Sequence, residues 1–299
     1  MIVLLIITAT LMIATPIYQK RILQKGTEAE AMRLTKLITQ NHHEVLESAK
    51  QLLSALANLE EIKNRNPTAC NKVLTNLVNA YPRYVAISVA DLSGDVFCAS
   101  IKSATPVNVT DRSYFQRVIK TQEFSIGDYN IGKISKKPIL GTAYPVNVNG
   151  VLASVIAATI DLSWLADEFA NLGLPEEATL LMTDSANVIL TSVPTSSGEI
   201  GKNFTNTDLI QASLTQKEGV VETSLENKKY LFSFTPLNDT PHGRLYVYVG
   251  IPEKTGFSDT IQYFSRDLRW LRFSYTFSLI LLFLAVFIPV YLKLKNVQK

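Results

Sequence analysis

Cysteine is scarce in this chain of 299 residues, where only Cys70 and Cys98 occur. Two cysteines are too few for a metal site built on cysteine, and no Cys-x-x-Cys motif is present. If the middle of the chain lies outside the cytoplasm, the pair can form a disulfide, because oxidising compartments favour that bond. Two reduced, buried thiols are the alternative, since the sequence supplies no distance between them.

Histidine is also rare, and the common catalytic motifs are missing. The three histidines are His42, His43 and His242. Neighbouring histidines on a helix point in different directions, and no motif sets any of the three beside a nucleophile. The chain also lacks a P-loop, a Gly-x-Ser-x-Gly elbow and the spacing typical of metal ligands. We therefore expect no enzymatic activity from the chain as given, no metal site and no cofactor.

Charged residues are under-represented, which directs attention to the membrane. They make up 18% of the chain, below the usual quarter, while hydrophobic residues make up 47%. The net charge of +3 argues neither for nor against nucleic acid, and we predict no nucleic-acid partner. Low charge together with a mean hydropathy of +0.13 indicates membrane-spanning segments.

Two apolar stretches are candidates for membrane helices. Residues 273–292 form an apolar run of about 20 residues, enough to cross a bilayer. Tyr275 and Tyr291 lie near its ends, where amphipathic rings favour the interface. The second candidate is residues 1–18. No basic residue precedes its apolar run, which favours an uncleaved anchor over a cleaved signal peptide.

Residues 19–63 are expected to form one long helix. Apolar residues recur there at three- and four-residue steps, and no proline interrupts them. About 40 residues at 1.5 Å each make a rod of roughly 60 Å, which suits a stalk leaving a membrane anchor. Its apolar face is either the seam of a homodimer, because the spacing resembles short heptads, or packed on its own domain.

The following part of the chain contains one structural unit twice. The first copy, residues 64–171, is expected to have strands at 84–90, 96–100, 139–148 and 151–160, helices at 111–120 and 162–171, and a loop at 124–129. The second copy, residues 172–256, repeats this order, with a weaker match for its helix at 208–214. We expect an α+β fold with two mainly antiparallel sheets. A connecting helix at 257–272 leads to the second span, and residues 293–299 remain as a cytoplasmic stub.

A candidate binding pocket lies in the first copy. Arg112 offers a planar fork of donors to a carboxylate, and Asp161 at a strand end can receive an ammonium. Tyrosines between them supply apolar walls with polar tips, as in pockets for small polar or zwitterionic molecules. The alternatives are that both charges lie on an ordinary surface, or that Asp161 only caps the helix that follows it. The candidate ligand-binding residues are Arg112, Tyr114, Arg117, Tyr129, Tyr144 and Asp161.

This arrangement resembles the double Cache domain, or PDC sensor, of bacterial transmembrane receptors. The motifs that carry the resemblance are Asp111-Arg112-Ser113-Tyr114-Phe115, Ile126-Gly127-Asp128-Tyr129, Ala143-Tyr144-Pro145-Val146 and Ile160-Asp161-Leu162. The resemblance covers about residues 20–272. It implies two tandem PAS-like modules outside the cytoplasm, with the ligand in the first, membrane-distal module. It also implies a cytoplasmic output, such as a two-component histidine kinase, a diguanylate cyclase or a chemoreceptor domain, that is absent from this chain as given.

The resemblance also bears on the ligand. Family members that bind amino acids carry arginine, tryptophan and tyrosine in the helix and an aspartate after the last strand. Arg112 and Asp161 match, whereas Tyr114 stands where tryptophan is expected and Phe115 where tyrosine is. The resemblance therefore implies an amino acid or a small organic acid held by Arg112, with help from Arg117. The second module lacks an arginine in its helix, which predicts a spacer and not a second pocket.

The resemblance completes the expected topology. We expect a two-pass protein of the bacterial inner membrane with residues 19–272 extracytoplasmic, and a homodimer formed through the long helix and the membrane helices. The alternative is a membrane-anchored scaffold that binds another protein and no small molecule.

Overall fold

The computed structural model describes residues 2–194, 199–225, 228–240 and 242–252, with isolated positions between 276 and 289. The chain divides into two units, Met1–Glu253 and Lys254–Lys299, and the first contains both sheets. The predicted connecting helix at 257–272, the stub at 293–299 and most of the predicted span at 273–292 lie outside the described residues. No helix in the described part of the chain is both long and apolar enough to cross a membrane.

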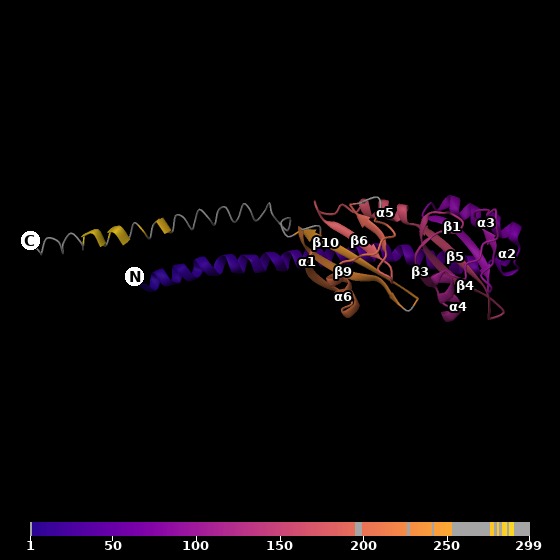
Figure 1. Cartoon of the computed structure of the whole chain (residues 1–299), viewed down its shortest axis with the longest axis horizontal. Coiled ribbons are helices and arrows are strands. Elements are labelled where there is room, and N and C mark those ends of the chain that lie inside the picture. The colour runs from indigo at the N-terminus through magenta and orange to yellow at the C-terminus, as the bar shows by residue number, and fades with distance from the viewer. Residues whose placement is uncertain are drawn as a thin grey trace, which may run out of the picture. The chain divides into compact units, whose positions relative to one another are not determined.

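The first module, residues 64–171, is built on an antiparallel sheet with the strand order β2-β1-β5-β4-β3 (Figure 1). The strands are β1 (Tyr84–Asp91), β2 (Val96–Ala99), β3 (Ser125–Ile131), β4 (Pro138–Val148) and β5 (Val151–Asp161). Helix α4 (Ser113–Thr121) packs on one face of this sheet, where Phe115 and Val118 meet Ala143 and Val155. Helix α5 (Leu162–Ala170) follows β5 directly.

Strand β3 corrects the prediction of a loop at residues 124–129. Gly127, Asp128 and Asn130 are weak strand formers, so the local sequence does not favour a strand. The segment nevertheless pairs with β4 over the register Ser125↔Ala143 to Ile131↔Pro138, with one irregularity between Ile126 and Tyr129. Pairing with an existing strand therefore overrides the local preference.

The second module, described to residue 252, repeats this topology with the order β7-β6-β10-β9-β8, which agrees with the predicted duplication. Its strands are β6 (Thr179–Thr183), β7 (Ile189–Val193), β8 (Gly219–Leu225), β9 (Lys228–Thr240) and β10 (Gly243–Pro252). Helix α6 (Thr207–Thr215) has the same length as α4 and the same place in the order. As with β3, the edge strand β8 has no counterpart among the predicted strands.

A single helix, α1 (Ile2–Ala57), packs on the face of each sheet opposite to α4 and α6. Its buried residues recur at three- and four-residue steps in its second half, as expected for an amphipathic helix: Ala31, Thr35, Ile38, Leu46, Ala49, Leu53 and Leu56. The chain leaves the helix after Ala57, and a short helix α2 (Glu60–Lys63) follows, so the predicted helix 19–63 is interrupted. The apolar face of α1 therefore joins the two modules within one chain.

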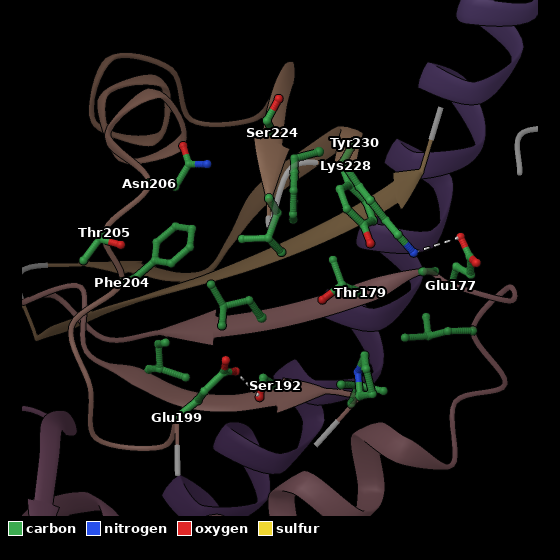
Figure 2. A pocket seen from close by; sticks show the side chains of 18 of the residues that line it. Glu177, Thr179, Ser192, Glu199, Phe204, Thr205, Asn206, Ser224, Lys228 and Tyr230 are labelled. Carbon is green, nitrogen blue, oxygen red and sulfur yellow. Dashed lines mark hydrogen bonds and ion pairs between the residues drawn. The ribbon is translucent and has the colours of Figure 1, made fainter. Parts of the chain in front are cut away.

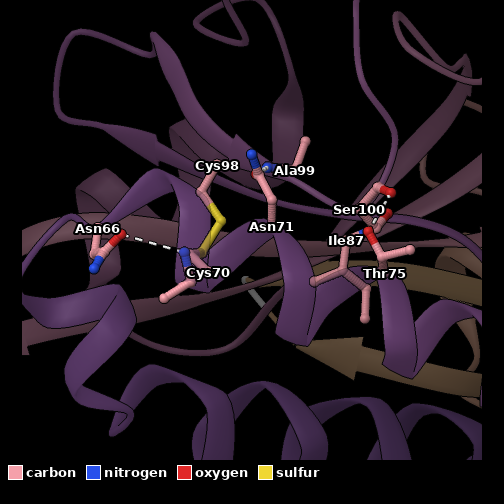
Figure 3. The surroundings of a disulfide bond; sticks show 9 residues. Asn66, Cys70, Asn71, Thr75, Ile87, Cys98, Ala99 and Ser100 are labelled. Atoms are coloured by element: carbon pink, nitrogen blue, oxygen red, sulfur yellow. Dashed lines mark hydrogen bonds between the residues drawn. A yellow bond between two sulfur atoms is a disulfide. The ribbon is translucent and has the colours of Figure 1, made fainter.

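Helix α3 (Pro67–Ala80) covers the edge strand β2 and is linked to it covalently (Figure 3). Cys70 and Cys98 form a disulfide with a Cα–Cα distance of 6.1 Å. Beside it, the Asn71 side chain accepts a hydrogen bond from the Ala99 N–H at 2.8 Å, and Thr75 donates to the Ser100 carbonyl at 2.8 Å. Closing a loop between cysteines 28 positions apart in sequence stabilises the fold by about 3–4 kcal/mol in the chain-entropy view.

Candidate functional site

Arg112 anchors the start of α4 to the end of β3. The residue occupies the N-cap position of α4 and is 7% exposed, but its side chain makes no capping bond. Its guanidinium donates to the Asn130 side-chain oxygen and, at 3.1 Å, to the Ile131 carbonyl. The Asp111 carboxylate lies 3.7 Å from its Nε. Arg112 is therefore a buried cation, and the structure does not place it on an ordinary surface.

Asp161 lies at the end of β5 and divides its two carboxylate oxygens between two tasks. One oxygen accepts from the Ser163 N–H at 2.9 Å and from the Ser163 hydroxyl at 2.5 Å, which caps α5. The other accepts from Lys137 Nζ at 2.9 Å. Burial alone would raise the pKa of Asp161, but the hydrogen bonds from Ser163 and Lys137 lower that pKa below its ordinary value. The group is thus a carboxylate at neutral pH.

The sheet register places these two groups on the same face and at the same end of the sheet. Asn130, which holds Arg112, pairs with Ile139, and Ile139 pairs with Asp161. Directly paired residues project from the same face. Two strand spacings separate Asn130 from Asp161, or about 10 Å.

Tyr114 packs against the same face of the sheet, in the row of residues next to this one. Its ring lies so close to Gly141 and Gly127 that a Cβ at Gly141 would overlap it. Tyr114 is 7% exposed, and burial raises its pKa to about 12. The phenol therefore stays neutral and forms an apolar wall beside the row of Asn130, Ile139 and Asp161.

The other three predicted residues lie elsewhere. Arg117 donates to both oxygens of Asp128, at 3.0 and 2.9 Å, and lies 3.4 Å from the Ser185 hydroxyl of the second module. Tyr129 donates its N–H to Asp184 at 2.8 Å, and its ring lies against Gly201, both in the second module.

Tyr144 packs in the core on the α1 side of the sheet, with Leu140 and Ile156. The structure thus places Arg112, Tyr114 and Asp161 on one face of the first sheet, whereas Arg117 binds Asp128, Tyr129 contacts the second module and Tyr144 packs on the other face.

Sequence reasoning missed two residues that bind Arg112 and Asp161 at the candidate site, namely Asn130 and Lys137. Asn130 directly follows the segment predicted as a loop, and Lys137 lies two residues before a predicted strand, where a lysine usually faces solvent. Nothing in the sequence pattern singled out Asn130, because its pairing with β4 appears only in the structure. The structure also shows no group of three or more potential metal ligands among the residues it describes.

The second module contains a cavity of about 950 Å³ on the α6 side of its sheet. Figure 2 shows the ring of Phe204 on one side and Tyr230 with Lys228 on the other. Glu199 accepts a hydrogen bond from Ser192 at 3.2 Å. The prediction that this module has no pocket is therefore wrong, because a missing arginine says nothing about how closely side chains pack.

Comparison with known proteins agrees with this architecture. The sequence profile described as Cache domain matches residues 13–259, more than half of the chain. No curated protein is a significant sequence match. The extracellular domain of the proposed histidine kinase rpHK1S-Z16 superimposes with a TM-score of 0.66 at 18% identity, over 77% of this chain and 96% of that one.

Two chemoreceptor domains are similar to the same extent. The ligand-binding domain of Pseudomonas fluorescens CtaA, in complex with L-isoleucine, has a TM-score of 0.64 at 14% identity, over 80% of this chain and 98% of that one. That of the Pseudomonas aeruginosa PAO1 amino acid chemoreceptor PctB, in complex with L-Arg, has a TM-score of 0.62 at 13% identity, over 77% and 97%. At these identities the likeness shows the fold. Together with the profile match it leads to one conclusion: this chain belongs to the Cache domain family.

Proposed function

We propose that this chain is the sensory region of a two-pass bacterial receptor and that its first module binds a small amino acid or organic acid. The observation that carries the proposal is that Asn130, which accepts a hydrogen bond from the Arg112 guanidinium, and Asp161 lie in one row on the same sheet face, two strands apart. At one end of this row the Arg112 guanidinium can bind a carboxylate, and at the other end the Asp161 carboxylate can bind an ammonium.

Two further observations support an amino acid ligand. Tyr114 supplies an apolar wall beside the two charges, as small-molecule sites require. The similar domains of CtaA and PctB are in complex with L-isoleucine and L-Arg, respectively. A carboxylate ligand without an amine would use Arg112 alone and would leave Asp161 with Lys137.

The proposal includes the membrane and the signal. Residues 1–18 and 273–292 would span the membrane, with residues 19–272 outside the cytoplasm, and the Cys70–Cys98 disulfide suits such an oxidising compartment. Two copies would pair through α1 and the membrane helices. A ligand shifts a receptor only by its different affinity for two states, and the contacts of Arg117 and Tyr129 with the second module offer a route for such a shift.

A thermal-shift screen of the purified full chain tests the proposal. Amino acids, organic acids and amines are added singly, and the melting temperature is recorded. A ligand at 100 times its dissociation constant should stabilise the protein by about 2.7 kcal/mol. If no compound raises the melting temperature, the ligand-binding proposal is contradicted, and the alternative of a scaffold for another protein is favoured.

A further inference from the structure

Residues 130–137, the end of β3 and its connection to β4, occupy both ends of the proposed ligand site. At one end, the Asn130 side-chain oxygen and the Ile131 carbonyl accept hydrogen bonds from the Arg112 guanidinium. At the other end, Lys137 donates to Asp161 at 2.9 Å. An acceptor oxygen on Arg112 and an ammonium on Asp161 are the same two groups that an amino acid would present.

The contact at Asp161 leaves one oxygen for one ammonium. Ser163 takes the first oxygen with both its N–H and its hydroxyl. Lys137 takes the second oxygen. An incoming ammonium that binds this carboxylate therefore competes with Lys137 for the second oxygen.

Lys137 can leave without exposing the core. Its side chain is 58% exposed, whereas that of Asp161 is 10% exposed. The backbone of the turn is held independently, because the Gly132 N–H donates to the Lys137 carbonyl at 2.8 Å. Lys133 also ties the turn to Asp111 at 2.6 Å. Release of the Lys137 side chain therefore breaks one ion pair and leaves the turn in place.

We propose that the β3–β4 connection is a built-in competitor for the site, in which Lys137 occupies the position of the ligand ammonium until an amino acid displaces it. The inference rests on the proposed function of this site and adds its regulation. The concentration at which the sensor responds is set by this competition, because the ligand binds only the fraction of molecules in which Asp161 is free. An ion pair with one exposed partner makes a modest competitor, and its removal should improve affinity by about 3- to 10-fold.

The variant Lys137→Met removes the ammonium and keeps the length of the side chain. Lys136→Met is the matched control, because Lys136 is the exposed neighbour and the change in net charge is the same. The probes are the twenty common L-amino acids and, as a pair that differs only in the amine, L-alanine and propionate. Lys137→Met should bind responding amino acids 3- to 10-fold more tightly, and Lys136→Met should bind them like the parent. Propionate should gain nothing from Lys137→Met. Equal or weaker amino acid binding by Lys137→Met would overturn the proposal.

A second measurement separates this inference from the proposed function. In the full chain without added ligand, lysines are acetylated with a limiting reagent, and each site is quantified by mass spectrometry. Lys137 should react more slowly than Lys136, and Asp161→Asn should remove the difference. If no amino acid binds any variant, this result alone decides whether Lys137 holds Asp161. Equal reactivity of Lys137 in the parent and in Asp161→Asn would then refute the proposal that Lys137 occupies the Asp161 carboxylate.

Discussion

The two modules have the same strand order but different residue types at equivalent positions. Arg112 precedes α4, and Asn206 precedes α6. Each donates to the edge strand beside it: Arg112 to Asn130, and Asn206 to Thr223 at 3.2 Å. The next positions in each row are also defined by register, with Asn130↔Ile139↔Asp161 in the first module and Thr223↔Tyr230↔Pro252 in the second. The first module therefore has a cation and an anion where the second has an amide and a proline.

The modules also fill the space between helix and sheet differently. In the first, Tyr114 of the helix packs on Gly141 of the sheet. In the second, the equivalent helix residue is the exposed Asp208, and the sheet position equivalent to Gly141 is Phe232, which packs on Gly250. The same fold therefore accommodates both packing arrangements. The apolar residues determine the fold of each sheet, and a few residues at its end determine which charged or polar groups are present.

The largest expected effect comes from removing the guanidinium of Arg112. Arg112→Ala should weaken amino acid binding about 100-fold, because it removes at least two charge-assisted hydrogen bonds from a buried site. The matched change Asn206→Ala should leave the dissociation constant unchanged and cost about 1 kcal/mol of stability, since Asn206 caps α6. Isothermal titration calorimetry of both variants makes the comparison. A loss of binding in Asn206→Ala would show that the modules do not differ in this way.

An intermediate effect is expected from the glycines under the two rings. Gly141→Ala and Gly250→Ala each place a methyl group against a ring, Tyr114 and Phe232 respectively, and overpacking should cost about 1–3 kcal/mol in both. Only Gly141→Ala should also weaken amino acid binding, by about 10-fold, because it displaces the wall of the site. Urea unfolding and calorimetry separate the two effects. Similar affinity losses in both variants would contradict the assignment of Tyr114 to the site.

The smallest effect concerns pH. The pKa of Asp161 is lowered in the folded state, so its ionised form stabilises the fold above the ordinary pKa of about 3.9, and this contribution is lost as pH falls through the lower folded value. Asp161→Asn keeps a capping oxygen and should cost a few tenths to about 1 kcal/mol at neutral pH.

Unfolding experiments on the parent and Asp161→Asn at several pH values test this expectation. The two stabilities should differ by a constant amount from about pH 5 to pH 8 and converge in stronger acid. A stability difference that grows as pH falls would show that folding raises the pKa of Asp161, contrary to this prediction. Pro252, the equivalent residue in the second module, has no such titration.

Several features followed from the sequence alone. Apolar runs with β-branched residues and turn signals predicted strands such as β1 and β5, and the repetition of their order predicted two similar modules. Arg112 and Asp161 stood out because a guanidinium can bind a carboxylate and a carboxylate at a strand end can bind an ammonium. The pair Cys70 and Cys98 could be named, but whether the two sulfurs meet depended on α3 lying over β2.

Only the tertiary structure decided which tyrosines face the site. An alternating pattern tells which residues of a strand share a face, but both faces of the first sheet are covered, one by α1 and the other by α4. Apolar residues therefore stand on both faces of β4, and alternation alone does not show on which side Tyr144 lies. The irregular pairing between Ile126 and Tyr129 further turns Tyr129 toward the second module. The position of Lys137 on Asp161 likewise needs the β3–β4 turn to be folded, because two residues separated by 24 positions meet only through strand pairing.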